Sequence, residues 1–170
     1  MSKESLIESK EVSMDDLIDI MVEKLDSGGT VTFTPRGTSM LPMLRDGEDV
    51  VILSKPKGRL HLFDLPLYRR KDGTYVLHRV INFDSDRGYV MCGDNQFKNE
   101  HGVYDEDIIA VVTAFYHKGK SYTVHSLRYK FYVHLWYNTK LIRRSLKLGK
   151  RGVSKIFPKK KKSAKKDCDD

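Results

Sequence analysis

The chain has 170 residues, of which 39% are hydrophobic, and this suits one domain of ordinary size with extensions. The mean hydropathy is -0.50, and no apolar run approaches the roughly 18–20 residues that a membrane-spanning helix requires. The first twelve residues are polar, so we expect no secretory signal and a cytoplasmic protein, with peripheral membrane contact as an alternative. The two cysteines lack metal-site spacing, and Cys168 lies in a polar tail, so we expect neither a structural disulfide nor a bound metal.

The positive charge is confined to the C-terminal part of the chain. Between Arg128 and Lys166 there are 15 Lys and Arg residues and no Asp or Glu. Residues 1–127 hold 16 basic and 20 acidic residues, so the formal charge of +8 belongs to the tail and not to the main domain. Only the tail is therefore a candidate for binding a polyanion.

The pattern of apolar residues predicts a mainly β (α+β) fold. Apolar residues at helical spacing predict a leading helix over residues 14–26, after a flexible N-terminus at 1–12. Short β-branched runs separated by turn residues then predict antiparallel strands. These strands are expected at residues 31–34, 50–53, 65–68, 74–83, 88–92, 108–116 and 121–124. Hairpin turns are expected near residues 71–73, 85–88 and 117–120, and the domain as a whole spans 13–124.

The C-terminal part contains a predicted helix followed by a polar tail. Apolar and aromatic residues at helical steps, interspersed with Lys and Arg, predict an amphipathic helix over residues 125–149. Residues 150–170 are lysine-rich and of low complexity. Such a segment buries too little apolar surface to offset chain entropy, so we expect disorder there.

Ser39 is the candidate nucleophile. A nucleophilic serine needs a turn that lets backbone N–H groups approach a carbonyl, and a rigid apolar wall that seats a peptide. Gly37 lets a substrate strand lie close, while Thr38, Met40 and Pro42 would complete the substrate and oxyanion site. The alternative interpretation of Ser39 is an ordinary turn residue.

His78 is the candidate general base. Strand alternation places it on one face with Val76 and Val80, and burial among apolar side chains would lower its pKa and keep it neutral. A neutral imidazole is what a serine nucleophile requires, although a packed histidine without a catalytic role fits the same pattern. The next acids along the chain are Asp94 and Glu100, and either is a candidate for the third member of a serine–histidine–acid site.

Four short stretches occur in an order that resembles the type I signal peptidase superfamily, which includes the LexA-like self-cleaving repressors. They are Gly37-Thr38-Ser39-Met40-Leu41-Pro42, Gly47-Glu48-Asp49-Val50-Val51, His78-Arg79-Val80-Ile81 and Gly93-Asp94-Asn95. The resemblance covers residues 31–112 and implies a coiled antiparallel β-sheet domain. The family's membrane anchor and its repressor helix-turn-helix domain have no counterpart among the stretches of this chain.

The resemblance also implies roles for the site residues. Ser39 matches the nucleophile, and His78 takes the place of the base, as in the Ser–His branch of the endoplasmic reticulum and archaea. The acid of that branch falls near Glu100, whereas Asp94 matches a turn aspartate of the wider family. The chain is thus expected to be a serine endopeptidase that cleaves an extended peptide without a metal or organic cofactor. The alternatives are a catalytically inactive, peptide-binding relative and a binding module that uses the basic tail.

The tail would supply a second binding surface. Aromatic side chains suit a lipid interface and polybasic segments are attracted to anionic lipid, so residues 125–166 are expected to bind an anionic membrane. The alternative interpretation is a helix that packs on the β-domain and leaves its basic side chains in solvent. Nucleic acid is the alternative partner, supported by charge alone. The candidate surface residues are Arg128, Lys130, Trp136, Lys140, Arg143 and Arg144.

Overall fold

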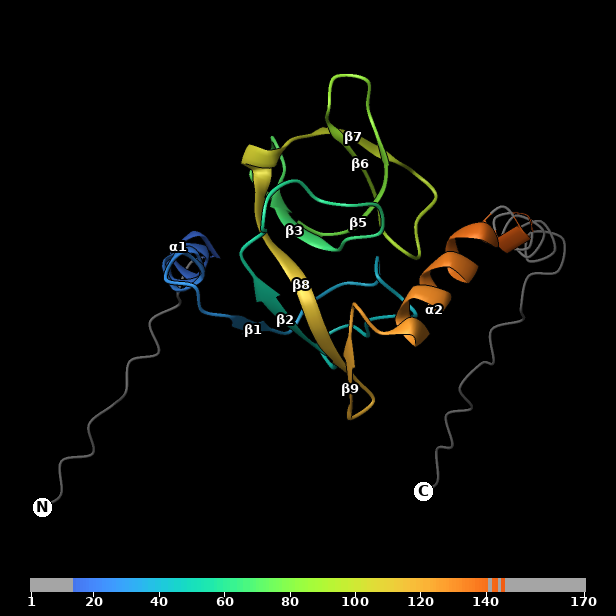
Figure 1. Ribbon diagram of the computed structural model, residues 1–170, viewed down its shortest axis with the longest axis horizontal. Helices are drawn as coiled ribbons and strands as arrows, with labels where there is room; N and C mark the ends of the chain where they lie inside the picture. The colour runs from blue at the N-terminus through green and yellow to red at the C-terminus, as the bar shows by residue number, and fades with distance from the viewer. Residues whose placement is uncertain (1–13, 141, 144, 146–170) are drawn as a thin grey trace, which may run out of the picture.

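The computed structural model describes residues 14–140, 142, 143 and 145. They form two antiparallel β-sheets, with helix α1 at one end of the molecule and helix α2 at the other (Figure 1). The prediction of a mainly β domain with an N-terminal and a C-terminal helix is confirmed. The predicted flexible segment at 1–12 and the lysine-rich segment at 150–170 lie outside the described residues.

The larger sheet has six strands in the order β1-β2-β8-β3-β4, with β9 also paired to β8. The long strand β8 pairs with β2 along one side and with β3 and β9 along the other. Among the described strands, β4 pairs only with β3, which leaves β4 at the edge of the sheet. The bounds are β1 Val31–Phe33, β2 Val50–Ser54, β3 Pro66–Arg69, β4 Tyr75–Leu77, β8 Ile108–His117 and β9 Lys120–Thr123.

The smaller sheet has three strands in the order β5-β6-β7. They are β5 Arg79–Phe83, β6 Tyr89–Cys92 and β7 Glu100–Val103. The expected turn near residues 85–88 joins β5 to β6, and the N–H of Asp84 donates to the carbonyl of Gly88 at 2.8 Å. Strand β7 was not predicted, because its sequence Glu-His-Gly-Val has no alternating apolar pattern.

The prediction of one strand over residues 74–83 is wrong. Strand β4 ends at Leu77 in the larger sheet, and β5 begins at Arg79 in the smaller one. Val80 instead exchanges backbone hydrogen bonds with residues 63 and 64, accepting from Phe63 at 2.8 Å and donating to Asp64 at 2.9 Å. The chain therefore changes sheets at His78, which lies between the two strands.

The two helices pack against the larger sheet by their apolar faces. Helix α1, Met14–Asp26, buries Ile18, Met21 and Leu25. Helix α2, Leu127–Asn138, is capped by the preceding Ser126, whose side chain accepts from the N–H of Tyr129. The expected helix at 125–149 is interrupted after Asn138, and the described residues Lys140, Ile142, Arg143 and Ser145 are again helical. No helix in the described ranges combines the length and apolar character needed to cross a membrane.

The core has two main parts, and the candidate site lies where they meet. The larger part joins α1, the six-stranded sheet, the loop after β1 and the inner face of α2. The smaller part lies under the three-stranded sheet and includes Tyr68, Val80 and Met91. Tyr68 belongs to β3 of the larger sheet but packs in the smaller core, so its side chain reaches across to the second sheet.

Candidate functional site: Ser39 and His78 in one cleft

Ser39 lies in the loop between β1 and β2, and a glycine turn shapes this loop. Gly37 adopts a φ of 100°, a conformation that favours glycine, and its N–H donates to Asp46 Oδ1 at 2.8 Å. On the other side of Ser39, Met40 and Leu44 are buried, and the N–H of Leu44 donates to the carbonyl of Met40 at 3.0 Å. Ser39 is therefore held half-buried between an open glycine turn and an apolar anchor.

The buried carboxylate of Asp49 closes the same loop. It accepts from the N–H of Arg45 at 2.8 Å and from His117 Nδ1 at 2.6 Å. Burial alone would raise the pKa of Asp49, but the hydrogen bonds from Arg45 and His117 outweigh burial and lower that pKa. Asp49, which belongs to the Gly47–Val51 stretch, is thus ionised and stabilises the loop.

His78 is nearly inaccessible to solvent, with 2% of its surface exposed. It lies at the break between β4 and β5, so its ring projects from neither regular strand. Burial lowers the pKa of His78 to about 4, and the positive charge of Arg70 acts in the same direction. At neutral pH the imidazole is therefore uncharged, as expected from the sequence.

Ser39 and His78 line one cleft of about 240 Å³. Gly37 and Met40 line it as well, together with the edge strand β4. Thr38 and Pro42 do not belong to this lining. The carbonyl of Thr38 accepts from Asn95 Nδ2 at 3.1 Å, and Pro42 lines a separate apolar groove beside α2.

Gly93 brings the serine and the histidine together. A Cβ atom placed on Gly93 would lie 3.1 Å from His78 Nε2 and 3.1 Å from Ser39 Cβ, so these two atoms are within twice that distance of each other. The same Cβ would lie only 2.7 Å from the carbonyl oxygen of Ser39, which is closer than real contacts allow. Position 93 therefore has space for glycine alone.

The rest of the Gly93–Asn95 turn holds the Ser39 backbone. The N–H of Asn95 donates to the carbonyl of Ser39 at 2.8 Å. Among the described residues, the N–H of Ser39 has no hydrogen-bond acceptor, and Ser39 Oγ makes no hydrogen bond to His78. Ser39 thus lines the cleft and has a backbone donor that no described acceptor occupies, which an oxyanion site requires.

Glu100 lies beside His78, and Tyr68 joins the two. Glu100 Oε2 is 3.9 Å from His78 Nδ1, which is too far for a direct hydrogen bond. The Tyr68 hydroxyl donates to Glu100 Oε2 at 2.9 Å and lies 3.3 Å from His78 Nδ1. Arg70 donates to both oxygens of Glu100, at 2.7 and 2.6 Å. The four side chains form one connected network.

This network determines which nitrogen of His78 carries the proton. Although burial raises the pKa of Glu100, hydrogen bonds from Arg70 and Tyr68 lower it overall, so the carboxylate is ionised. Burial, followed by the bond to Glu100, raises the pKa of Tyr68, so the phenol keeps its single proton. Because Tyr68 gives that proton to Glu100, its oxygen can only accept from His78 Nδ1. Nδ1 is then protonated, and Nε2, beside Ser39, has a free lone pair.

Asp94 has different partners. It forms a buried, bidentate ion pair with Arg79, with Nε to Oδ1 and Nη2 to Oδ2 both at 2.8 Å. Arg79 also donates to the Tyr129 hydroxyl at 2.8 Å, which ties β5 to helix α2. Of the two acids expected to support His78, the structure therefore joins Glu100 to it and pairs Asp94 with Arg79.

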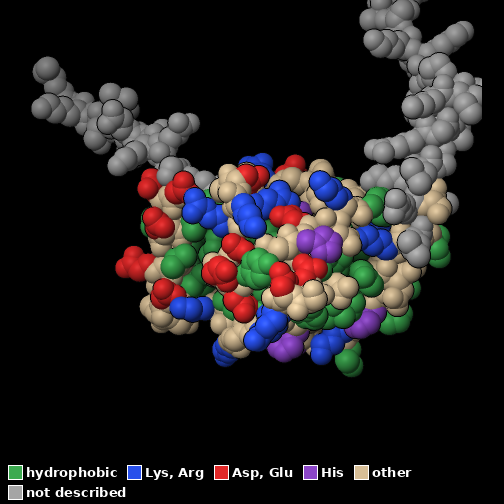
Figure 2. All heavy atoms as spheres, turned by 90° about the horizontal axis from the view of Figure 1, so that it is seen from above, with side chains coloured by type: hydrophobic (Ala, Val, Ile, Leu, Met, Phe, Trp, Pro, Cys, Tyr) green, Lys and Arg blue, Asp and Glu red, His purple; other side chains and the backbone are tan. Residues whose placement is uncertain are grey.

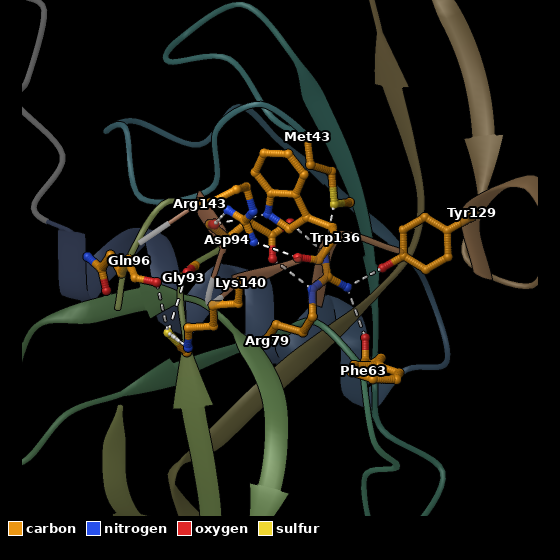
Figure 3. Close-up of polar contacts among 11 residues, drawn as sticks. Met43, Phe63, Arg79, Gly93, Asp94, Gln96, Tyr129, Trp136, Lys140 and Arg143 are labelled. Atoms are coloured by element: carbon orange, nitrogen blue, oxygen red, sulfur yellow. Dashed lines mark hydrogen bonds and ion pairs between the residues drawn. The ribbon is translucent and has the colours of Figure 1, made fainter. Parts of the chain in front are cut away.

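Helix α2 covers the outer side of this turn. Figure 3 shows Asp94 between Arg79 and the side chains of Trp136 and Arg143. Trp136 Nε1 donates to the carbonyl of Asp94 at 2.9 Å, and the Arg143 guanidinium lies 3.6 Å from the Trp136 ring centroid. Lys140 Nζ donates to Cys92 Sγ at 3.2 Å. These three residues were expected on a binding surface, but their side chains contact the domain.

The remaining expected surface residues have other positions. Lys130 is exposed, Arg128 lines the apolar groove that contains Pro42, and Arg144 lies outside the described residues. Sequence reasoning missed Tyr68 and Arg70 as site residues, because Tyr68 lies in β3, Arg70 directly follows this strand, and no local pattern links either residue to His78. Within the described ranges, no cluster of three or more His, Cys, Asp or Glu side chains could hold a metal ion.

Comparisons of the sequence with protein-family models and curated proteins, and of the structure with solved structures, found no match.

Proposed function

We propose that this protein is a serine endopeptidase of the signal-peptidase-like type, with Ser39 as the nucleophile and His78 as the general base. The observation that carries the proposal is the approach of Ser39 Cβ and His78 Nε2 to one point beside Gly93, each at 3.1 Å. The lone pair on Nε2 is the acceptor that a serine hydroxyl needs. The order of the four sequence stretches supports the same interpretation.

In the proposed reaction, His78 Nε2 takes the proton of Ser39 Oγ while Oγ attacks the scissile carbonyl. The N–H of Ser39 donates to the oxyanion that forms. Protonated His78 then gives its proton to the amine as the C–N bond breaks, which leaves Ser39 acylated. In the second step His78 Nε2 takes a proton from the water that attacks the acyl carbonyl, and returns it to Ser39 Oγ as the C–Oγ bond breaks. Catalytic hydrogen bonds are often long in unliganded sites and shorten when substrate binds, so the open Ser39–His78 geometry is compatible with this role.

Tyr68 and Glu100 act in this proposal as positioning residues. Neither lines the cleft, and both act through His78. The Tyr68 oxygen keeps the proton on Nδ1, and the Glu100 carboxylate orients the Tyr68 hydroxyl and attracts the positive charge that develops on the imidazole. Arg70 holds Glu100 in place and keeps it ionised.

The cleft favours an extended peptide as substrate. Its lining includes Tyr75, Val76 and Leu77, which make up the whole of the edge strand β4. An edge strand presents backbone N–H and C=O groups that can pair with a further strand. A peptide added along β4 would bring its carbonyl groups past Ser39 and His78.

Labelling with a fluorophosphonate probe tests the proposal directly, because the probe reacts with an activated serine. Wild-type protein is expected to be labelled on Ser39 and to cleave members of a peptide library, whereas Ser39→Ala is expected to do neither. Ser85→Ala is the matched control, since Ser85 is exposed in the β5–β6 turn, and it should behave as wild type. Equal labelling of wild type and Ser39→Ala would refute the assignment of Ser39 as the nucleophile.

A peptide-binding domain that does not cut is the second candidate function. The observation in its favour is the missing hydrogen bond between Ser39 Oγ and His78 among the described residues. This candidate predicts that library peptides bind wild type and Ser39→Ala with equal affinity and that neither protein releases cleaved product. The same peptide library, read by binding and by mass spectrometry, separates the two functions.

A further inference from the structure

Helix α2 and the residues after it carry apolar side chains on two opposite faces. On the inner face, Tyr129 and Val133 are buried, with 7% and 2% of their surfaces exposed. On the other face, large apolar side chains point away from the domain, and we call them the outer stripe. The outer stripe consists of Leu127, Phe131, Leu135 and Ile142, which are 84%, 72%, 53% and 62% exposed.

The spacing of the outer stripe within α2 is that of one helix face. Leu127, Phe131 and Leu135 recur every four residues, and Ile142, which is also helical and exposed, lies beyond the break after Asn138. Contiguous exposed apolar side chains mark a surface that binds a partner. The domain already covers the inner face, so the outer stripe is a surface without a partner among the described residues.

The charge around the outer stripe indicates the kind of partner. The sequence contains no Asp or Glu between Leu127 and Lys166, and Arg128 and Lys130 flank the stripe. Helix α1, at the opposite end of the molecule, contains five Asp and Glu residues and one lysine (Figure 1). Figure 2 shows acidic side chains at the end that carries α1 and across the middle of this face. The molecule is therefore polarised, and an anionic surface attracts the α2 end and repels the α1 end.

We propose that the outer stripe inserts into the interfacial layer of an anionic lipid bilayer, with the flanking basic side chains at the headgroups. A helix with apolar side chains on one side and Lys and Arg beside them is the arrangement by which peripheral proteins lie on membranes. The inferred contact differs from the sequence-based expectation, because Trp136 and Arg143 are engaged with Asp94 and the lipid-facing residues are aliphatic and phenylalanine side chains.

Other occupants fit less well. A second copy of the chain packed on the same stripe would bring the basic side chains of both copies together without an acid between them. Nucleic acid is bound by donors to phosphate and by stacking, and the centre of this surface offers Leu, Phe and Ile side chains. A bilayer is the partner that takes up the apolar stripe and the positive flanks at once.

Vesicle sedimentation of the full chain tests the proposal. Vesicles of phosphatidylcholine alone are compared with vesicles of an equimolar mixture of phosphatidylcholine and phosphatidylglycerol. Wild type is expected to sediment with the anionic vesicles, and added salt should weaken this binding. The double variant Phe131→Ser/Leu135→Ser is expected to lower the partition coefficient at least about tenfold, because it removes two apolar side chains whose transfer from water into the bilayer favours binding.

The matched control is Leu17→Ser/Ile20→Ser, which changes two exposed apolar side chains of α1 and should leave the partition coefficient within about twofold of wild type. Circular dichroism of both variants checks that the fold is kept, which is expected because all four side chains are exposed. Equal sedimentation of the Phe131→Ser/Leu135→Ser variant and wild type would show that basic residues suffice, and would overturn the proposal. A wild type that dimerises through the stripe, or binds duplex DNA but no vesicles, would overturn it as well.

Discussion

The hydroxyl oxygen of Tyr68 lies 3.3 Å from His78 Nδ1, while its proton is donated to Glu100. A phenol with one proton cannot donate to both neighbours, so this contact selects the His78 tautomer whose free nitrogen, Nε2, approaches Ser39. The contact crosses between elements, because Tyr68 comes from β3 and His78 from the break between β4 and β5. It gives the proposed peptidase a specific dependence on a tyrosine that does not line the cleft.

Tyr68→Phe is therefore expected to slow the reaction of Ser39 without weakening the binding of the probe. Loss of the acceptor for Nδ1–H should lower the maximal rate of fluorophosphonate labelling about 10- to 100-fold and leave the probe affinity unchanged. The acid limb of the pH–rate profile should also move to higher pH. Without the intervening hydroxyl, the Glu100 carboxylate acts directly on His78 and raises its pKa. Tyr104→Phe, which removes an exposed hydrogen bond from the Tyr104 hydroxyl to Asp86, is the control. An unchanged pH profile would show that Tyr68 only packs in the core and does not position His78.

The pKa of His78, lowered to about 4, predicts an unusually acidic limit for labelling. The base acts only when it is neutral, so the rate should rise with pH and reach half its plateau near the lowered pKa. At pH 5.5 wild type should still react at nearly full rate, whereas a histidine with an ordinary pKa of 6.5 would leave only about a tenth of the sites active. A half-maximal rate near pH 6.5 would contradict the buried, uncharged imidazole.

The same lowered pKa makes the stability of the fold depend on pH. Between the folded pKa of about 4 and the ordinary value of 6.5, the unfolded chain binds a proton at His78 that the folded chain does not bind. The contribution of this residue is therefore at its full value above pH 6.5 and is lost as the pH falls towards 4. From pH 7.5 to pH 5, wild type should lose about 2 kcal/mol more of its unfolding free energy than His78→Gln. Urea titrations at both pH values measure this difference.

Gly93→Ala is expected to separate the serine from the histidine. The added Cβ would meet the Ser39 carbonyl at 2.7 Å, so either the loop or the turn must shift. We expect at least about a 100-fold loss of labelling and a loss of roughly 1–3 kcal/mol in unfolding free energy. Gly119→Ala is the control, since Gly119 has a φ of 73° and open space around it. That variant should lose about 1 kcal/mol of stability and keep the labelling rate of the folded protein.

Asp94→Asn is expected to affect mainly stability, and Glu100→Gln mainly the labelling rate. Asp94→Asn leaves the buried charge of Arg79 without its partner, so the free energy of unfolding should fall by roughly 3–5 kcal/mol. Glu100→Gln breaks a partly exposed pair with Arg70 and should cost only about 1 kcal/mol, but it should lower the labelling rate about tenfold. Denaturant titrations and labelling rates of both variants check the assignment. Larger destabilisation by Glu100→Gln than by Asp94→Asn would reverse the two roles.

Local patterns predicted much of the fold. The helix at residues 14–26 follows from apolar spacing and acidic residues in its first turn, and it is found at Met14–Asp26. The three expected hairpin turns are also found, because their glycines and polar residues have local conformational preferences. The run at 74–83 was predicted as one strand because its apolar pattern is continuous. Its break at His78 arises from hydrogen bonds with residues 63 and 64, which no local pattern reveals.

By itself, the sequence determined the helix and most of the strands, and it singled out Ser39, His78 and two candidate acids, because spacing and residue chemistry are properties of short segments. Only the tertiary structure decided between those acids. Asp94 belongs to the turn that holds Ser39, yet its side chain pairs with Arg79, and Glu100 reaches His78 through Tyr68. That choice depends on distances of a few ångströms between β3, β5 and β7, and such distances are set by the packing of the two sheets.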